Sequence, residues 1–287
     1  MNILLLGSTG LIGAAVHAKL HATAHTVIAP TSTELDFQRP DTWTAWLQQA
    51  DALVNCVGVM TADGDLMQAV QCAAPQALYQ QAQAKGMGYV LQVSALGASV
   101  DADTVFLRSK GQLDAWLLAS GLNVGIVRPS LVFAKTGRSS RLFVSLAKLP
   151  HLWLPEAGHM AIQPLTIQPV ALEDVATAVV AMLQSRYSGV VNAVGGEVLS
   201  LAAYLTLLRQ HAWQRGPAHI HALPVSWAKR AAGVLQYVSS GLITPASIDM
   251  LLESEEVEVE DFARVLGRQP QTPAQFLQAA YAQGAHK

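Results

Sequence analysis

Hydrophobic residues along the chain fall into short uninterrupted runs that alternate with longer segments of helical spacing. Short apolar runs bounded by small residues are typical of strands that are buried on both faces. They predict strands at 3–6, 26–29, 52–55, 89–94, 124–127 and 190–192. The spaced segments predict helices at 11–20, 41–49, 66–84, 109–119, 172–183, 201–210 and 225–237. Because strands separated by helices need crossover connections, the pattern predicts a parallel sheet with helices on both faces.

The pattern loosens after Arg128 and Pro129. The prolines that divide the following segment into short pieces are Pro150, Pro155, Pro164 and Pro169. We therefore predict a core at 1–134 and a cap region at 135–287 that contains a late strand and helices and packs intimately on the core. The expected fold class is α/β, a doubly wound parallel sheet with a small, mainly helical C-terminal cap.

Composition excludes several classes of protein. Of the 287 residues 51% are hydrophobic and 13% are charged, which excludes a disordered or fibrous chain. The net charge is -2 and the basic residues are spread thinly, so we expect no nucleic-acid partner. No window reaches the roughly 18 apolar residues of a membrane-spanning helix. Two cysteines, Cys56 and Cys72, are too few for a disulfide framework or a zinc site, and we expect a cytoplasmic protein.

An acidic segment stands out near the C-terminus. Residues 253–261 hold six of the 20 acidic residues of the chain. A run of like charges is usually a solvated face or loop, and that is the interpretation we favour over a docking patch for a basic partner.

The most informative motif for chemistry lies between the first predicted strand and the first predicted helix. A pyrophosphate approaches backbone amides only where side chains are absent, and a helix N-terminus faces it with partial positive charge. Glycines spaced Gly-x-x-Gly-x-x-Gly at this place predict a Rossmann-type dinucleotide site. Its residues are Gly7, Ser8, Thr9, Gly10, Leu11, Ile12 and Gly13.

The end of the second predicted strand is where specificity for the adenosine ribose is usually set. Thr31 and Ser32 stand there, with neither an acid to hold a ribose diol nor a base to hold a 2′-phosphate. Because an acid would repel a phosphate, its absence favours NADP over NAD, with the two hydroxyls as donors. Asp36 has two interpretations, an acceptor for the adenine amino group or a turn-capping residue.

Other strand ends meet at the same edge of the predicted sheet. Ligands of open α/β sheets bind beyond the carboxyl ends of the strands. The third strand ends in a small residue and a glycine, which leave room for a ribose or nicotinamide. The predicted cofactor-lining residues at these ends are Cys56, Val57, Gly58, Ser94, Arg128, Pro129 and Ser130.

These segments together resemble a known family, the atypical short-chain dehydrogenases/reductases, and within it the branch of the nucleotide-binding accessory subunit of mitochondrial complex I. The resemblance runs from residue 1 to about residue 210. It rests on the glycine turn and on the segments 93–98 (VSALGA), 107–110 (LRSK), 127–133 (VRPSLVF) and 173–176 (EDVA). After residue 211 it is faint, through 266–270 (LGRQP). The resemblance implies an NAD(P)-binding Rossmann fold.

The resemblance also implies a catalytic pair, Tyr-x-x-x-Lys, in which the phenol transfers a proton while the lysine binds the ribose and lowers the pKa of the phenol. In this chain the lysine is Lys110, which is therefore a predicted cofactor-binding residue as well, but the tyrosine position holds Phe106. A phenyl ring has no titratable proton. Ser94 stands where the family places its catalytic serine, so Ser94 and Lys110 are the candidate catalytic residues.

Two other titratable residues have ordinary structural interpretations. His159, in the irregular segment 151–169, is either a proton donor or simply an exposed loop histidine. Asp174 is predicted to be a first-turn acid stabilised by the helix dipole. The remaining histidines suggest neither a catalytic triad nor a metal site.

Two functions remain open at this stage. The first is an NAD(P)-binding protein that serves as a redox sensor, assembly factor or structural subunit, which the missing phenol favours. The second is an NAD(P)H-dependent oxidoreductase, or an epimerase-like enzyme, that acts on a quinone, carbonyl or nucleotide-sugar-like substrate with a non-standard proton donor. The expected partners are a dinucleotide, a small molecule of unknown identity, and a second copy of the chain or another protein.

Overall fold

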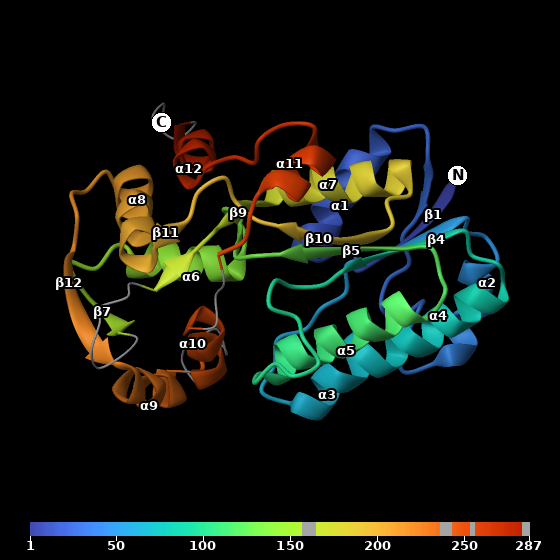
Figure 1. The fold of residues 1–287 in the computed structure, drawn as a ribbon, viewed down its shortest axis with the longest axis horizontal. Helices are drawn as coiled ribbons and strands as arrows, with labels where there is room; N and C mark the ends of the chain where they lie inside the picture. The colour runs from blue at the N-terminus through green and yellow to red at the C-terminus, as the bar shows by residue number, and fades with distance from the viewer. Residues whose placement is uncertain (157–164, 236–242, 253–255, 283–287) are drawn as a thin grey trace. The chain divides into compact units, whose positions relative to one another are not determined.

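The computed structural model describes residues 1–156, 165–235, 243–252 and 256–282, and Figure 1 traces the chain through them. The chain forms two compact units. Unit 1 comprises Met1–Pro129, Leu172–Ala193 and Glu260–Arg268. Unit 2 comprises Ser130–Ala171, Val194–Val259 and Gln269–Lys287.

Unit 1 is built on a six-stranded sheet in the order β10-β5-β4-β3-β1-β2. Its strands are β1 (Asn2–Leu6), β2 (Thr26–Ile28), β3 (Ala52–Asn55), β4 (Tyr89–Val93), β5 (Val124–Pro129) and β10 (Gly189–Ala193). Every neighbouring pair is parallel, and Leu4 of β1 lies between Ile28 and Leu53 of the two adjacent strands. Because the chain runs outward from β1 to β2 and then returns to β3, the strand order reverses beside β1. Ligands of open α/β sheets bind at such a reversal.

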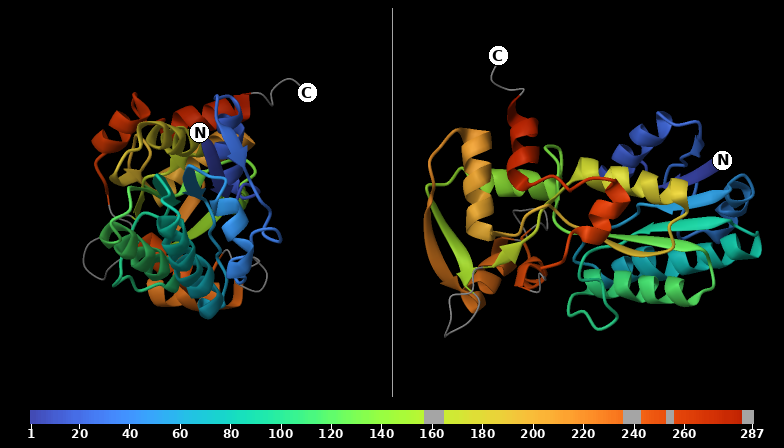
Figure 2. Two further views of the ribbon diagram at one scale, coloured as in Figure 1. Left: turned by 90° about the vertical axis from the view of Figure 1, so that its right-hand side faces the viewer. Right: turned by 45° about the horizontal axis from the view of Figure 1, so that its top comes forward.

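Helices cover both faces of this sheet (Figure 2). On one face lie α1 (Leu11–His21), α7 (Leu172–Ser185) and α11 (Glu260–Leu266). On the other face lie α2 (Thr44–Leu47), α3 (Gly64–Gln68), α4 (Ala74–Ala84) and α5 (Val105–Ala119). The predicted doubly wound α/β sheet is therefore confirmed.

The predicted helix 66–84 is interrupted. It consists of α3, a π-helical turn at Ala69–Ala73, and α4. Pro75, at the start of α4, has no N–H group, so it cannot donate the hydrogen bond that a continuous helix would direct to the carbonyl of Gln71. The extra residue of the π turn lies just before Pro75, where the helical hydrogen bond is missing. Such single π turns within helices are often found at functional sites.

Other helix boundaries also differ from those predicted. Over the predicted helix 41–49 the structure has a 3-10 turn, Pro40–Thr42, followed by the short α2. Helix α5 begins four residues before the predicted residue 109, because the Thr104 hydroxyl accepts a hydrogen bond from the Leu107 amide at 3.4 Å and caps the helix earlier. The end of the predicted helix 225–237 lies outside the described residues.

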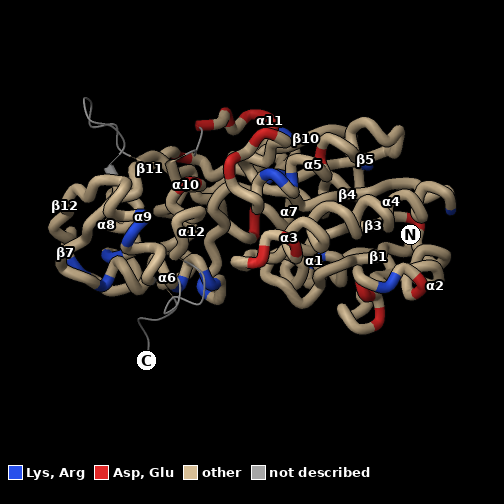
Figure 3. Tube along the Cα trace, turned by 90° about the horizontal axis from the view of Figure 1, so that it is seen from below, with Lys and Arg blue, Asp and Glu red and all other residues tan. Residues whose placement is uncertain are grey.

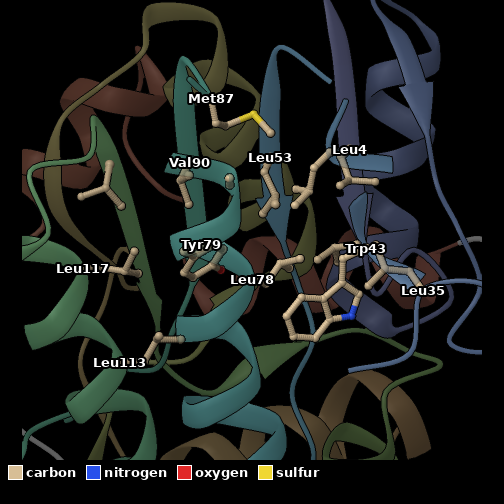
Figure 4. Packing of buried hydrophobic residues seen from close by; sticks show 14 of the residues in the cluster. Leu4, Leu35, Trp43, Leu53, Leu78, Tyr79, Met87, Val90, Leu113 and Leu117 are labelled. Atoms are coloured by element: carbon tan, nitrogen blue, oxygen red, sulfur yellow. The ribbon is translucent and has the colours of Figure 1, made fainter. Parts of the chain in front are cut away.

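The core of unit 1 fills the space between the sheet and the α4–α5 layer (Figure 4). Leu53 and Val90 from the strands meet Leu78 of α4, and all three side chains are fully buried. The Tyr79 hydroxyl lies in this core, where it donates to the Gln92 side chain and accepts from the Asn55 side chain at 2.9 Å. Buried polar groups need such partners, so this network anchors α4 to the ends of β3 and β4.

Unit 2 contains five helices within the part of the chain that the structure describes. They are α6 (Arg138–Leu146), α8 (Leu201–Trp213), α9 (Val225–Leu235), α10 (Pro245–Leu252) and α12 (Pro273–Ala282). Three strand pairs accompany them: β6 (Val132–Phe133) with β9 (Val170–Ala171), β7 (His151–Glu156) with β12 (His219–Pro224), and β8 (Thr166–Ile167) with β11 (Leu199–Ser200). Phe133 stacks on Phe276 at 4.9 Å between ring centroids, and both are buried with Leu205 and Leu208.

The two units divide the chain differently from the predicted ranges 1–134 and 135–287. Helix α7, strand β10 and helix α11 follow residue 134 in the sequence but belong to unit 1. The reason is pairing: β10 forms a parallel ladder with β5, and α7 packs against α1 and α11. The predicted late strand is thus the edge strand of the main sheet.

Charged residues are unevenly distributed. Figure 3 shows acidic residues on α11 and the segment before it. Glu256, Glu258, Glu260 and Asp261 are all exposed, as expected for a solvated face, whereas Glu253 and Glu255 lie outside the described residues. No described helix is long and apolar enough to cross a membrane.

Candidate functional site

The glycine turn between β1 and α1 leaves no room for side chains at two of its three glycines. Gly7 has a φ of +75°, and a Cβ there would lie 3.0 Å from backbone atoms of Cys56 and Val57. A Cβ on Gly13 would lie 2.0 Å from the carbonyl oxygen of Gly7. Gly10 has an ordinary φ of -76°, and a Cβ there would meet only the Gly7 oxygen within 4 Å, at 3.3 Å. The fold thus requires Gly7 and Gly13, whereas a Cβ on Gly10 would be crowded only by the Gly7 carbonyl oxygen.

The amino end of α1 offers free backbone donors. Gly10 is the N-cap and makes no side-chain capping bond, and the first turn carries no acidic residue. The first hydrogen bond that closes a helical turn runs from the Ala14 amide to the Gly10 carbonyl at 2.8 Å. The preceding amides, those of Leu11, Ile12 and Gly13, lie before that bond and form the electropositive end of the helix. Such an end is a site for a phosphate.

The loop after β2 contains an acid, Glu34, that is not among the predicted site residues. The Glu34 carboxylate accepts hydrogen bonds from both the amide and the hydroxyl of Thr31, each at 2.8 Å. These bonds lower the pKa of Glu34, so the carboxylate is charged at neutral pH. The Thr-x-x-Glu spacing is that of a capping box and is the signal that predicts this contact. Ser32, the second predicted donor, is exposed.

Asp36 is occupied in the turn that follows. Its side chain accepts a hydrogen bond from the Gln38 amide at 2.8 Å, and its backbone carbonyl accepts one from the Trp43 indole at 2.6 Å. This is the turn-capping arrangement, one of the two interpretations of the sequence. The other oxygen of the carboxylate could accept a hydrogen bond from an adenine amino group, and this role stays a prediction.

The end of β3 lies directly beside the glycine turn. The Val57 amide donates to the Asn55 side chain at 2.9 Å, which fixes the backbone that Gly7 packs against. Burial raises the pKa of the Cys56 thiol to about 12, so this cysteine is an inert thiol at neutral pH. Gly58 faces Lys110, because a Cβ there would lie 3.6 Å from the lysine Nζ atom.

The π turn presents a residue that the sequence argument missed. Gln71 is buried, its Oε1 accepts a hydrogen bond from the Val59 amide at 3.3 Å, and its Nε2 donates to the Ser109 hydroxyl at 3.1 Å. Gln71 therefore ties the loop after β3 to α5 next to Lys110. The proline at position 75 is the signal in the sequence that could have drawn attention to this turn.

Lys110 is buried at the carboxyl edge of the sheet. Its ammonium donates to the Val93 carbonyl at 3.3 Å and lies 5.6 Å from the centroid of the Phe106 ring, one helical turn earlier. Burial lowers the pKa of Lys110 to about 8, while Asp114 and Cys56 oppose that shift. Phe106 and Lys110 share one face of α5.

Ser94 belongs to a buried charge network that the sequence argument also missed. Its hydroxyl donates to Oδ2 of Asp114 at 2.8 Å, and the same oxygen accepts from Arg128 Nε at 2.8 Å. Asp114 is 1% exposed, and its other oxygen, Oδ1, has no hydrogen-bond partner within the described residues. Burial raises the pKa of Asp114, while Arg128, Ser94 and Lys110 lower it. The spacing Lys-x-x-x-Asp on α5 is the sequence signal for this residue.

Of the other predicted residues, Pro129 lies at the carboxyl end of β5, whereas Asp174 and Ser130 lie elsewhere. Asp174 is a buried first-turn acid of α7 and forms an ion pair with Arg268, in keeping with its structural interpretation. Ser130 is the first residue of unit 2, where its hydroxyl donates to the Gln168 carbonyl at 2.5 Å. His159 lies outside the described residues. Pro129 ends β5, and its carbonyl accepts from the Leu96 amide at 2.9 Å.

Unit 1 therefore brings most of the predicted residues to one edge of its sheet. The glycine turn, the ends of β2 to β5 and the face of α5 that carries Lys110 all belong to it. Three residues join the predicted set there: Glu34, Gln71 and Asp114. Among the described residues, no group of three or more His, Cys, Asp or Glu side chains is arranged to hold a metal ion.

No family model and no curated protein sequence matches the chain. Its structure is similar to many solved ones. A nucleoside-diphosphate-sugar epimerase from Staphylococcus aureus aligns over 97% of this chain and 100% of its own, with 15% identity and a TM-score of 0.73. A dTDP-4-dehydrorhamnose reductase from Bacillus anthracis in complex with NADP aligns over 98% of both chains, with 11% identity and a TM-score of 0.72. The protein RMD from Pseudomonas aeruginosa, complexed with NADPH, covers 98% of this chain and 97% of its own at 14% identity and a TM-score of 0.68.

These neighbours confirm the predicted resemblance at the level of fold. The chain has the Rossmann-type α/β fold that these sugar-nucleotide epimerases and reductases also have, along almost its whole length. Identities this low show the fold alone. The closer likeness to the complex I accessory subunit stays a prediction.

Proposed function

We propose that the protein binds a nicotinamide dinucleotide, NADP in preference to NAD, at the carboxyl edge of the unit 1 sheet. The observation that carries the proposal is the amino end of α1, which has no side-chain cap, begins at Gly10 and follows a turn that excludes side chains. A pyrophosphate is the natural anion for such an end. The NADP and NADPH bound to two of the structural neighbours support the choice of cofactor.

Other residues of unit 1 fit the remaining parts of the cofactor. Within the described residues the Lys110 ammonium makes one hydrogen bond, to the Val93 carbonyl, and an ammonium has three donors, so it has donors left for ribose hydroxyls. Gly58 leaves space beside that ammonium. At the adenosine end, Thr31 and Ser32 would have to give their donors to a 2′-phosphate, and the Glu34 carboxylate opposes this in the described conformation.

We further propose that the protein acts as a dinucleotide-binding redox sensor, assembly factor or structural subunit. Standard carbonyl chemistry needs a proton donor beside the substrate oxygen. Phe106 has no proton to give, and Ser94 directs its single proton to Asp114. The two groups that would hydrogen-bond a substrate carbonyl in a tyrosine-containing relative are therefore unsuited to it here.

A second function is favoured by Lys110. Its pKa of about 8 makes the ammonium a much better acid than an exposed lysine, and it lies one helical turn from Phe106. A bound NADPH supplies a hydride. Lys110 would donate the matching proton to the substrate oxygen and regain it from water. The protein would then be an oxidoreductase for a quinone, a carbonyl or a nucleotide-sugar-like substrate.

The first experiment is a fluorescence titration of the full chain with NADPH and with NADH. We expect saturable binding of both, tighter for NADPH. Gly10→Val should abolish binding and lower the melting temperature only slightly, because φ at this position is ordinary and a Cβ would be crowded by one backbone oxygen, at 3.3 Å. Gly216→Val is the matched control, since nothing lies within 4 Å of a Cβ there. Binding that survives Gly10→Val would place the phosphate elsewhere and contradict the proposal.

Turnover then separates the two functions. Quinones, aldehydes and sugar nucleotides are offered with NADPH to the natural chain, to Phe106→Tyr and to Lys110→Met. The binding role predicts no turnover by the natural chain. The enzymatic role predicts turnover that Lys110→Met removes and that falls as the pH rises through the pKa of Lys110 in the dinucleotide complex.

A further inference from the structure

The two most exposed large hydrophobic side chains among the described residues lie on one helix of unit 2, α9. They are Val234, which is 71% exposed, and Trp227, which is 61% exposed. Residues seven apart on a helix share one face, so the two side chains form an apolar strip along α9. The opposite side of the helix is buried, since Ala228 and Ala232 pack with Ile248 of α10. Within the described residues, α9 thus presents an apolar face that nothing covers.

The support of this helix is the strand pair β7 and β12. Helix α9 follows β12 directly and packs against both strands (Figure 1). Trp153 of β7 is 59% exposed and stacks on His221 of β12 at 5.0 Å between ring centroids. Trp153 and Trp227 are the two exposed tryptophans of the chain, because the other four are buried or half-buried. Both exposed indoles therefore belong to this part of unit 2.

The charge of the same region is positive. Arg230 is exposed on the face of α9 between Trp227 and Val234, with its guanidinium 5.9 Å from the centroid of the Trp227 ring. It forms no ion pair within the described residues, whereas its neighbour Lys229 pairs with Asp249. The chain contains no Asp or Glu from residue 198 to residue 248, a range that includes both β12 and α9. The exposed face of α9 therefore combines apolar side chains with an unneutralised cation.

An anionic bilayer surface matches this combination. Indole rings favour the boundary between headgroups and hydrocarbon, aliphatic side chains gain by entering the hydrocarbon, and guanidinium groups pair with phosphates. A single-stranded nucleic acid would satisfy Arg230 and stack on Trp227, but it would leave Val234 in water. Helices that lie in the membrane interface have such an apolar face with cations beside it.

We propose that α9 binds the surface of a bilayer that contains anionic phospholipids. Trp227 and Val234 enter the bilayer at the level of the headgroups, and Arg230 pairs with lipid phosphates. Because one short helix buries little apolar area, the binding is reversible and depends on the anionic lipids. The proposal is independent of the dinucleotide site, whose residues belong to unit 1.

The experiment is a flotation assay of the full chain with vesicles of phosphatidylcholine alone and vesicles of equal parts phosphatidylcholine and phosphatidylglycerol. We expect the chain to float with the anionic vesicles, to bind the neutral ones weakly, and to be released as the salt concentration rises. Tryptophan emission should shift to shorter wavelength on binding, and lipids brominated on the acyl chains should quench it. Trp227→Phe should keep most of the binding and remove most of this quenching.

Variants assign the binding to this face. Trp227→Ala should weaken vesicle binding by about tenfold and Val234→Ala by about three- to fivefold, because each removes buried apolar area. Arg230→Ala should weaken it by about fivefold. The matched controls are Leu118→Ala, at an apolar position of unit 1 that is 52% exposed, and Lys85→Ala, at an exposed cation of unit 1, and neither should change the binding.

Each outcome either supports the proposal or overturns it. All the substituted side chains are exposed, so the variants should melt at the temperature of the natural chain, and circular dichroism checks this. Absence of binding, equal binding to both kinds of vesicle, or equal losses in the controls would overturn the proposal. A loss confined to Arg230→Ala would show a general polyanion surface instead of a membrane surface. A dimer that dissociates in Trp227→Ala, measured by sedimentation velocity without lipid, would show that a second copy covers the face.

Discussion

Removing Lys110 should stabilise the protein at neutral pH while weakening dinucleotide binding. The perturbation is Lys110→Met, which keeps most of the volume of the side chain and removes its charge. Burial lowers the pKa of Lys110 from 10.5 to about 8. That difference of about 2.5 pKa units corresponds to about 3 kcal/mol less favourable free energy for the charged lysine in the folded state. Since the ammonium also interacts with Asp114, we expect a net gain of about 1–3 kcal/mol for Lys110→Met at pH 7.

The pH dependence gives this prediction its sign. Between pH 8 and 10.5 the unfolded lysine still holds its proton and the folded one has lost it, so the unfolding free energy of the natural chain rises with pH. Lys110→Met lacks that slope, and its advantage should shrink to near zero by about pH 10.5. Urea denaturation at pH 7, 8, 9 and 10 measures the difference. A variant less stable than the natural chain at pH 7, or an advantage that does not change with pH, would refute the reasoning.

Three further substitutions test other parts of unit 1. Gly13→Ala should lower the free energy of unfolding, measured by urea denaturation, by about 3 kcal/mol or more, because its Cβ would lie 2.0 Å from a backbone oxygen. Gly216→Ala is the control, and it should change that free energy by less than about 0.5 kcal/mol because nothing lies within 4 Å of a Cβ there. Glu34→Gln should tighten NADPH binding by about two- to fivefold in a fluorescence titration and leave NADH nearly unchanged, since it removes an exposed charge near the predicted 2′-phosphate; equal effects on both cofactors would contradict this placement. Gln71→Ala should lower the free energy of unfolding by about 1–3 kcal/mol, because it leaves the Val59 amide without its partner, and it should weaken the binding of both cofactors. Gln71→Glu keeps an accepting oxygen for that amide and should partly restore both stability and binding.

The sheet and the glycine turn could be predicted from the sequence because both leave local patterns. Buried parallel strands are uniformly apolar, as at 3–6 and 124–127, and a turn that excludes side chains requires glycine. The place of the late strand could not be predicted in the same way. Gly189–Ala193 is recognisable as a strand, but its pairing with β5 is a long-range choice that periodicity does not encode.

The residues that the sequence argument missed depend on contacts across the chain or on unusual local geometry. In the sequence, Asp114 is simply a polar position on a predicted helix. Its contacts with Ser94 and Arg128 arise only because α5 packs against the sheet. Glu34 looks like a surface acid until its loop folds back onto Thr31. In each case the sequence contains a compatible spacing, but the same spacing also occurs where nothing binds.

The buried lysine helps to decide between the two proposed roles. In the family that the sequence resembles, the corresponding lysine lowers the pKa of a neighbouring phenol. The neighbour here is Phe106, whose ring offers a cation–π contact at 5.6 Å. Without a ligand, Lys110 is a net cost to the fold, because burial of its charge is only partly offset by Asp114 and the Val93 carbonyl. Ribose hydroxyls would supply the missing acceptors and lower that cost on binding. Lys110 should therefore have a higher pKa in the dinucleotide complex, so that binding takes up protons near pH 8. Calorimetry in buffers of different ionisation enthalpy measures this proton uptake, and Lys110→Met should abolish it.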